Sequence, residues 1–318
     1  MMFSRMASLK IADGADIPLN FDSMLDLKFH VKYTVNQVYG GADISICGLN
    51  RTNAMQHIQV LAKGLEMAKA DKKVVTLKAG YQYGEGAKCL EIYKGTSYNA
   101  MVSGTPDVWL NMHCMTQYVE VNMFKQFQIK KKMKLETACK EICRVALEKP
   151  CMWAVTNPKA LKMEIDGFNS ISLLDTKVES VRRELEELGG GLIRCYVEDK
   201  LNFSPMIIMD RDPDQASIQS VMGMVGVEQK QFSCLGEPGM GVVYGIPQPT
   251  YNGIELDVQL DPTIRRWQLF TVNSKMVPVV NGRQYVITAY EHKGHLRGQE
   301  WKTHIKGIAL DGKAYMGI

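Results

Sequence analysis

The sequence predicts an α+β fold that is mainly β, in which two small antiparallel β-barrels flank a small α+β domain. Two observations predict the barrels: short segments in which apolar and polar residues alternate, and glycine-containing turns between these segments. A third observation predicts the insert, because the two clearest amphipathic helical patterns lie between the strand-rich blocks. We expect the first barrel over residues 1–124, the α+β domain over 125–210 and the second barrel over 211–318.

Length and composition are those of a globular protein with room for several cores. The chain has 318 residues, of which 46% are hydrophobic and 23% are charged, and its net charge is +4. A charge this small does not by itself predict binding to nucleic acid or membranes. No apolar run is long enough for a transmembrane helix, and residues 1–19 lack the apolar core of a signal peptide, so Sec export is not expected. The eight cysteines are irregularly spaced, which favours reduced thiols in the cytoplasm over a disulfide framework.

The first block contains the clearest alternation in the chain. Apolar residues occupy every second position from Leu25 to Val35, and Gly40-Gly41 supplies a turn into a returning strand over 42–47. A short helix is predicted to begin near Asn53 and end near Gly64. Further strands are predicted over 74–79, 89–93, 96–102 and 108–114, and this spacing of strands and turns is typical of a small barrel or sandwich.

The middle block contains the helices. An apolar face that begins at Leu135 predicts a helix that Pro150 stops, and a second helix is predicted over 176–188, where Thr176 and Glu179 form a capping box. Short strands are predicted over 161–165, 192–197 and 203–209. The basic run Lys125–Lys134 is interpreted as a solvated strand or linker, with contact to DNA as the alternative.

The last block returns to strands. Residues 226–245 are glycine-rich and are predicted to form one long connection, followed by strands over 254–258 and 269–272. The segment 285–305 is predicted to form a β-hairpin: alternation over 285–290, a long polar tip that includes Gly294 and Gly298, and a second strand from Trp301.

Three groups of short motifs resemble a known family. These are Val75-Thr-Leu-Lys-Ala-Gly-Tyr81 with Glu91–Gly95 and Pro106–Leu110; Gly253-Ile254 with Leu260–Ile264 and Asn281–Val286; and the final hairpin with Glu291-His-Lys-Gly294 and Trp301-Lys-Thr303. Their order is similar to that in the baseplate hub proteins of contractile-tailed bacteriophages, the phage tail protein D-like family. The chain departs from the family pattern at Arg266-Trp267, where a glycine is usual.

The resemblance implies a structural role in the virion. A late structural protein of this family would form a homotrimer with tube-type barrels, a pseudo-sixfold ring that joins the sixfold tail tube to the threefold central spike. Its implied partners are the spike protein, the tail tube protein or tube-initiator, and baseplate wedge or other inner-baseplate proteins. DNA would pass through the lumen only transiently, and no membrane, cofactor, metal or catalytic residue is implied. Assembly would occur in the host cytoplasm, and the protein would reside in the tail baseplate.

Two other classes of protein stay open. A metal-dependent cell-wall hydrolase of the tail would use His292, His295 and His304, with Glu291 or Glu300 beside the metal. An OB-like module that binds carbohydrate or nucleic acid would need exposed aromatic residues on one face, whereas we expect the aromatic residues Trp109, Tyr285 and Trp301 to lie in the core.

Three further motifs are interpreted as structural. Gly84-Glu-Gly86 and Gly236–Gly241 lack the lysine and the following helix of a phosphate-binding loop. Cys139, Cys143 and Cys151 lack the spacing of a zinc site and are interpreted as buried thiols.

Overall fold

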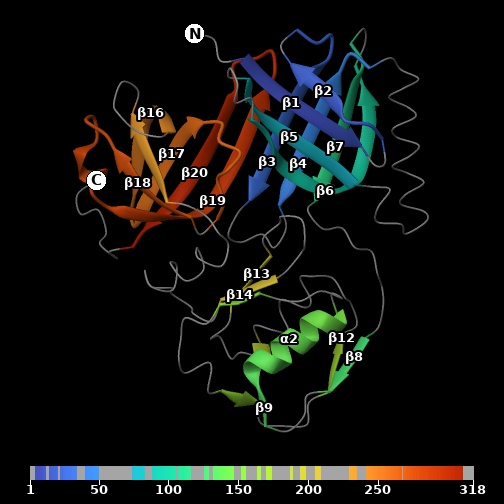
Figure 1. Cartoon of the computed structure of the whole chain (residues 1–318), viewed down its shortest axis with the longest axis vertical. Coiled ribbons are helices and arrows are strands. Elements are labelled where there is room, and N and C mark those ends of the chain that lie inside the picture. Colours follow the sequence, from blue (N-terminus) through green and yellow to red (C-terminus); the bar gives the residue numbers. More distant parts are fainter. Residues whose placement is uncertain are drawn as a thin grey trace. The chain divides into compact units, whose positions relative to one another are not determined.

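The structure is a computed structural model, and it consists of two compact units. Unit 1 combines residues 1–118 with residues 227–318, and unit 2 comprises residues 119–226. The structure describes residues 4–11, 14–20, 22–33, 40–49, 74–82, 88–104, 107–115, 125–128, 132–146, 152–154, 163–165, 170–173, 187–188, 194–197, 205–208, 229–234, 241–266 and 268–310. Over these residues the fold is α+β and mainly β (Figure 1).

Unit 1 contains a sheet of thirteen strands in the order β18-β15-β16-β17-β20-β19-β3-β4-β7-β6-β5-β1-β2. The N-terminal strands are β1 (Ser4–Ile11), β2 (Ile17–Asn20), β3 (Asp26–Tyr33), β4 (Gly41–Cys47), β5 (Val74–Gln82), β6 (Lys88–Ser103) and β7 (Trp109–Met115). The C-terminal strands are β15 (Lys230–Cys234), β16 (Gly241–Thr250), β17 (Gly253–Gln259), β18 (Leu269–Asn273), β19 (Gln284–His295) and β20 (Trp301–Ala309), with a 3-10 helix η3 (Pro278–Val280) between β18 and β19.

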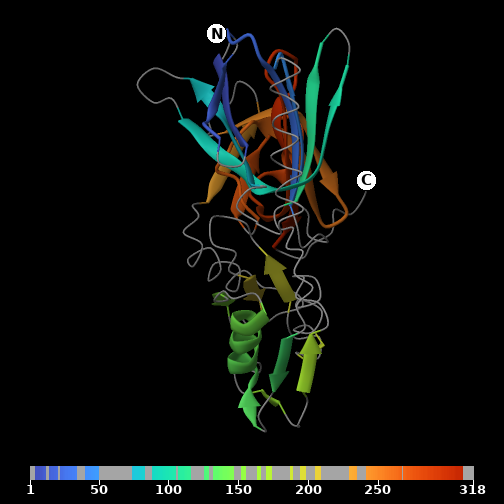
Figure 2. The ribbon, with the colours of Figure 1, turned by 90° about the vertical axis from the view of Figure 1, so that its right-hand side faces the viewer.

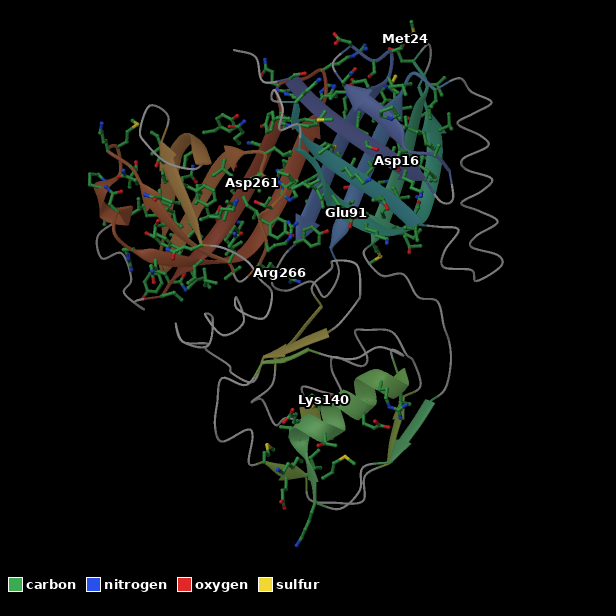
Figure 3. All side chains as sticks on the ribbon, in the orientation of Figure 1. Asp16, Met24, Glu91, Lys140, Asp261 and Arg266 are labelled. Carbon is green, nitrogen blue, oxygen red and sulfur yellow. The ribbon has the colours of Figure 1, made fainter. Side chains whose placement is uncertain are left out.

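The C-terminal strands pair in a cycle. The order β18-β15-β16-β17-β20-β19 returns to β18, because β18 also pairs with β19 from Leu269↔Val286 to Thr271↔Gln284. The loop after β17 is anchored by Asp261, labelled in Figure 3, which accepts a hydrogen bond of 2.9 Å from Lys230 on β15. Burial alone would raise the pKa of Asp261, but hydrogen bonds from Thr263 and Lys230 hold it below its usual value.

The N-terminal strands join this cycle through β3. Strand β3 pairs with β4 on one edge and with β19 on the other, over six residue pairs from Tyr290↔Tyr33 to His295↔Lys28. We call this pairing the β3–β19 junction. In Figure 1 the blue and green strands β1–β7 therefore lie beside the orange and red strands β16–β20, and Figure 2 shows the same sheet from the side.

One apolar core serves both sets of strands. Alternate residues of β3 and β4, such as Leu27, Val31 and Ile46, are fully buried. On the C-terminal strands, Ile305 is fully buried and Leu256 is 3% exposed. Phe29 on β3 contacts Trp301 on β20 edge to face, with ring centroids 5.4 Å apart. The two sets therefore share a hydrophobic core across the β3–β19 junction.

Unit 2 contains the described helix α2 (Leu135–Ala146) and short strands. The strands are β8 (Lys125–Gln128), β9 (Met133–Lys134), β10 (Met152–Ala154), β11 (Glu164–Ile165), β12 (Ser170–Leu173), β13 (Arg194–Val197) and β14 (Pro205–Ile208). The predicted helix from Leu135 is confirmed, and its apolar face buries Leu135, Ala138, Cys139 and Ile142 completely. Most of the basic run Lys125–Lys134 belongs to β8 and β9, and its remaining residues lie outside the described ranges except Lys132, which has a positive φ of 63°.

Several predicted elements are confirmed and others are corrected. The strands and hairpin over 25–47, and the strands at 74–79, 108–114, 254–258 and 269–272, are present, with shifts of a few residues at their ends. The predicted break at Gly95 is wrong, because β6 is continuous. A Cβ at this position would lie 2.2 Å from the Tyr93 hydroxyl, so this glycine serves close packing within a strand.

Two further corrections concern glycine-rich segments. Gly294 lies inside β19 rather than in the hairpin tip. A glycine leaves room there for Phe29, because a Cβ would lie 2.2 Å from its ring. The segment 226–245 is not one connection, since Lys230–Cys234 forms β15 and Gly241 begins β16. The predicted helix over 53–64 lies outside the described residues, as does all of the helix over 176–188 except Glu187 and Leu188.

Among the described residues, no helix is both long enough and apolar enough to cross a membrane.

Candidate assembly surface

The outward side of the sheet in unit 1 carries a row of paired charges. We call it the paired-charge face, and it consists of the outward side chains of β17, β20, β19, β3, β4 and β7. Because neighbouring residues in register point to the same side of a sheet, the pairings Asp257↔His304, His304↔Glu291 and Glu291↔Lys32 place four charged or titratable groups in one row. Four of the six histidines in the sequence pair with carboxylates in unit 1.

The pairs at the C-terminal end of this face link β17 with β20. Asp257 accepts a hydrogen bond of 2.7 Å from Lys302 and lies 2.8 Å from Nδ1 of His304. Glu255 accepts a hydrogen bond of 2.8 Å from Lys306. Burial alone would raise the pKa of Asp257, but the hydrogen bonds from Lys302 and His304 hold it below its usual value. The Asp257 carboxylate is therefore ionised at neutral pH and matched by the Lys302 ammonium.

The pairs at the β3–β19 junction connect residues far apart in the sequence. His30 on β3 lies 2.7 Å from Glu291 on β19, and Lys293 lies 3.3 Å from the same carboxylate. His295 at the end of β19 lies 2.8 Å from Asp26 at the start of β3. Burial would raise the pKa of Glu291, but hydrogen bonds from His30 and Lys293 lower it below its usual value. The polar side of the junction is thus held by contacts between carboxylates and His or Lys side chains, as its buried side is held by aromatic packing.

The N-terminal end of the face, on β4 and β7, also carries hydrogen-bonded polar side chains. Asp43 on β4 lies 2.6 Å from His113 on β7, and the amide of Asn111 bridges the hydroxyls of Ser45 and Ser103. Trp109 lies half-buried on this face, with the Lys28 ammonium 4.4 Å from its ring centroid. The expectation that Trp109 lies in the core is wrong, because Leu110, Met112 and Cys114 occupy the inward positions of β7.

The paired-charge face has a consequence for contact with polyanions. Lysines attract nucleic acid strongly when binding to phosphates releases counterions, and that gain is smaller for a lysine already held by a carboxylate. Lys302, Lys306 and Lys293 each have such a partner. The attraction of this face for phosphates is therefore smaller than its number of lysines alone would give.

The three histidines proposed for a metal site do not converge. His292 is fully buried in the core and hydrogen-bonds through Nδ1 to the Thr303 hydroxyl at 2.9 Å. Burial, together with the positive charge of Arg265, lowers the pKa of His292 to about 3. His295 and His304 instead pair with carboxylates on different strands. Within the described ranges, no three His, Cys, Asp or Glu side chains are grouped as metal ligands would be.

The remaining motifs give no further site among the described residues. Burial raises the pKa of the Cys89 thiol to about 11 and that of Cys114 to about 12, so both are protonated and unreactive at neutral pH. Cys139 is buried in α2, whereas the side chains of Cys143 and Cys151 lie outside the described part of the chain. The glycine motif at 84–86 and most of 236–241 also lie outside it.

Sequence analysis alone did not identify the paired-charge face. Its signal was present in the alternation, since the polar positions of the strands at 25–35 and 301–306 hold lysine, histidine and acidic residues. The pairing between His30 and Glu291 depends on the register of two strands about 260 residues apart, and alternation along one strand does not specify that register.

Solved structures of tail proteins have a similar fold. A type VI secretion component of E. coli, the c3393 protein, whose description notes structural similarity to the T4 phage tail proteins gp27 and gp5, aligns over 98% of this chain and 79% of its own, with a TM-score of 0.54 and 9% identity. A tail protein of Neisseria meningitidis MC58 aligns over 96% and 97% with a TM-score of 0.52 and 7% identity. The 43 kDa tail protein of prophage MuSo2 from Shewanella oneidensis aligns over 97% and 99%, with a TM-score of 0.52 and 10% identity.

At these identities the structural matches establish the fold alone, and no curated protein sequence matches the chain. Family membership rests on a different comparison. The family model described as baseplate hub gp41 matches residues 7–231, which is more than half of the chain. The chain therefore belongs to the baseplate hub gp41 family, whose members are structural proteins of the phage tail baseplate.

Proposed function

We propose that this protein forms a homotrimeric ring with pseudo-sixfold symmetry in the baseplate of a contractile tail. The ring would connect the tail tube, or its initiator, to the central spike, contact wedge or other inner-baseplate proteins, and surround the channel through which DNA leaves. The protein would be a non-enzymatic, late virion component assembled in the host cytoplasm. Membership of the baseplate hub family supports this proposal.

The observation that carries the proposal is the presence of two strand sets in one chain. Unit 1 contains seven N-terminal and six C-terminal strands that share one sheet and one core. We propose that each set acts as a tube-type barrel domain, with the segment 125–210 as an α+β domain between them. Three copies would then supply six similar modules, which suits a ring that adapts a sixfold tube to a threefold spike.

Neither alternative has a supporting arrangement among the residues that the structure describes. The hydrolase hypothesis needed His292, His295 and His304 to converge, and their separate partners do not favour it. The OB-like hypothesis needed exposed aromatic residues on one face. Among the described residues, the exposed aromatic residues are instead spread over separate elements. Tyr98 lies on β6, Tyr244 lies on β16 and Tyr251 lies in the turn after β16.

Electron microscopy and native mass measurement test this proposal. The purified chain should be studied alone and together with the protein encoded beside it, because closure of the ring can require the spike. We expect a threefold ring with six lobes, an open centre and a protein mass of about 107 kDa, three times 35.7 kDa. A particle that stays monomeric in both preparations would contradict the proposal.

The lumen provides a second test. Phosphates would bind a narrow ring of lysines, so we predict that the Lys125–Lys134 run does not line the narrowest part of the channel. A map of the ring in which these lysines surround the constriction would contradict this prediction.

A further inference from the structure

The core side of the β19–β20 hairpin contains two buried nitrogen atoms that have no hydrogen-bond partner among the described residues. They are Nε2 of His292 and Nε1 of Trp301, and these residues are 0% and 3% exposed. His292 lies opposite Thr303, and Trp301 lies two residues before Thr303 on the same side of β20. Side chains at such diagonal positions on neighbouring strands can reach one another. Because an unpaired polar group in a core is costly, the two nitrogens point to a bound partner.

The hydrogen bonds of Thr303 indicate that both nitrogens are donors. The Thr303 hydroxyl oxygen accepts a hydrogen bond of 3.1 Å from the backbone N–H of Asp261 and lies 2.9 Å from Nδ1 of His292. Burial lowers the pKa of His292 to about 3, so the imidazole is neutral and only one of its nitrogens carries a hydrogen. Donation of the hydroxyl hydrogen to Nδ1 leaves no hydroxyl hydrogen unused, and it places the imidazole hydrogen on Nε2. Since the indole nitrogen of Trp301 is always a donor, the partner of both nitrogens is an acceptor.

Two guanidinium groups lie beside these donors. Arg265 is 9% exposed and donates hydrogen bonds to two backbone carbonyl oxygens of its own loop, and no described carboxylate lies within ion-pair distance of it. Its positive charge adds to the lowering of the His292 pKa, which shows that the two side chains are close. The guanidinium of Arg5 lies 5.6 Å from the centroid of the Trp301 ring, and it also donates to backbone carbonyl oxygens. A buried cation normally has an anionic partner, so the charge of Arg265 calls for one.

We propose that Arg265, His292 and Trp301 bind a small monovalent anion of the halide class, such as chloride, in the core beside β19 and β20. The anion would accept hydrogen bonds from both N–H groups and would neutralise the buried guanidinium. A water molecule fits less well, because its own hydrogens would need acceptors in a region lined by donors. Since Arg265 belongs to the loop after β17, the anion would also hold this loop against the hairpin. The inference does not depend on the proposed ring.

The carboxylate of Glu91 on β6, labelled in Figure 3, is the competing partner for Arg265. Glu91 is half-buried, and its pKa is raised mainly by burial, although the positive charges of Lys94, Lys78 and Arg265 oppose the shift. No ion pair of Glu91 is formed within the described part of the chain. The two explanations predict opposite results for Glu91→Gln. Loss of a true counter-charge would lower stability without any gain in anion affinity, whereas loss of a repelling carboxylate should strengthen anion binding.

Halide titration of the full-length chain tests the site. When chloride replaces gluconate at constant ionic strength, it should raise the unfolding temperature and shift the NMR signal of the Trp301 indole N–H, both in a saturable way. Trp301→Phe, which also assigns that signal, and Arg265→Gln should each weaken chloride binding by about tenfold or more. Glu91→Gln should strengthen it. Arg297→Gln is the matched control, because Arg297 is an exposed arginine in the tip of the same hairpin.

A crystal of the unsubstituted chain soaked in bromide makes the test independent of how the variants fold. Anomalous signal between Arg265, His292 and Trp301 is the expected result. The proposal is overturned if stability and the indole signal respond equally to chloride and gluconate, above all if the indole proton shows cross-relaxation with a bound water. An equal loss of chloride binding in Arg297→Gln would also overturn it, because the effect would then be general screening of charge. So would a Glu91→Gln variant that loses stability and gains no chloride affinity.

Discussion

The two strand sets of unit 1 lie in one sheet but differ in how their pairings end. The C-terminal strands pair in a cycle, so each of their described members has a neighbour on both edges over at least part of its length. The pairings of the N-terminal strands form an open series from β2 to β3, and β3 needs β19 as its second neighbour. Although the two sets have similar numbers of strands, the N-terminal set is less independent, because it needs strand β19 of the C-terminal set to complete its pairing.

Truncation of one core aromatic residue in each set should give the largest effect. Phe270 packs against Phe232 and Tyr285 inside the C-terminal cycle, and Phe29 packs against Trp301 at the β3–β19 junction. We expect Phe270→Ala and Phe29→Ala each to lower the free energy of unfolding by about 3–5 kcal/mol in denaturant titrations. In hydrogen exchange, Phe29→Ala should reduce protection mainly in β1–β7, whereas Phe270→Ala should reduce it in both sets. Equal loss in both sets for both variants would contradict the asymmetry.

A smaller change at the junction tests its packing directly. A Cβ at Gly294 would lie 2.2 Å from the Phe29 ring, so Gly294→Ala should lower the free energy of unfolding by about 1–3 kcal/mol. Gly41→Ala is a matched control in β4, because the nearest atom to its Cβ would be 4.0 Å away. Thermal and denaturant unfolding of both variants should separate crowding at the junction from the general effect of adding a methyl group. Equal stabilities would show that Phe29 moves aside easily.

The pH dependence of stability should reveal the buried His292 in the C-terminal set. Its pKa is about 3 in the folded chain against about 6.5 in an unfolded chain, so between these values the unfolded state binds a proton that the folded state does not. Stability should therefore fall by about 1.4 kcal/mol for each pH unit below about 6.5. Comparison between pH 6 and 5 avoids most of the carboxylate titration.

His292→Asn should remove most of this slope, whatever it does to absolute stability. His304→Gln is the control, since His304 lies on the paired-charge face and pairs with Asp257. A slope unchanged in His292→Asn would contradict the buried neutral imidazole.

The contact of Arg5 with the β19–β20 tip should give the smallest effect. Arg5 on β1 donates hydrogen bonds to the carbonyl oxygens of His295 and Gly298, and its guanidinium lies 5.6 Å from the Trp301 ring centroid. We expect Arg5→Ala to cost about 1–2 kcal/mol in denaturant unfolding. Lys306→Ala, which removes an exposed ion pair, should cost less than about 1 kcal/mol. If the two costs are equal, Arg5 does not help to hold the N-terminal strands against the hairpin.

Alternation along the sequence predicts which face of a strand a residue occupies better than it predicts which strand lies beside it. It correctly placed Leu27, Val31 and Trp301 inside, because this property depends on single strands. It would also have placed Trp109 outside had its polar neighbours Asn111 and His113 been weighed above its aromatic character. The same alternation in Ala7, Leu9 and Ile11 marks β1, which sequence analysis missed.

The glycines that sequence analysis placed wrongly are those that make room for an aromatic side chain. Gly95 and Gly294 resemble turn residues in the sequence, but in the fold each makes room for an aromatic side chain, Tyr93 in one case and Phe29 in the other. For Gly294 that side chain comes from a strand more than 250 residues earlier. The contacts of His30 and His295 with carboxylates across the β3–β19 junction depend on the same long-range register.

The β3–β19 junction can form only late during synthesis of the chain. Strand β3 ends at Tyr33, and its partner residues on β19 begin at Tyr290. At roughly 5–20 residues per second, the ribosome needs roughly 13 to 50 seconds to make the intervening chain. During that time one edge of β3 and the apolar side chains around Phe29 lack their final partners, which exposes the nascent chain to aggregation. We therefore expect a high yield of this protein to depend on chaperones that cover β3 until β19 emerges.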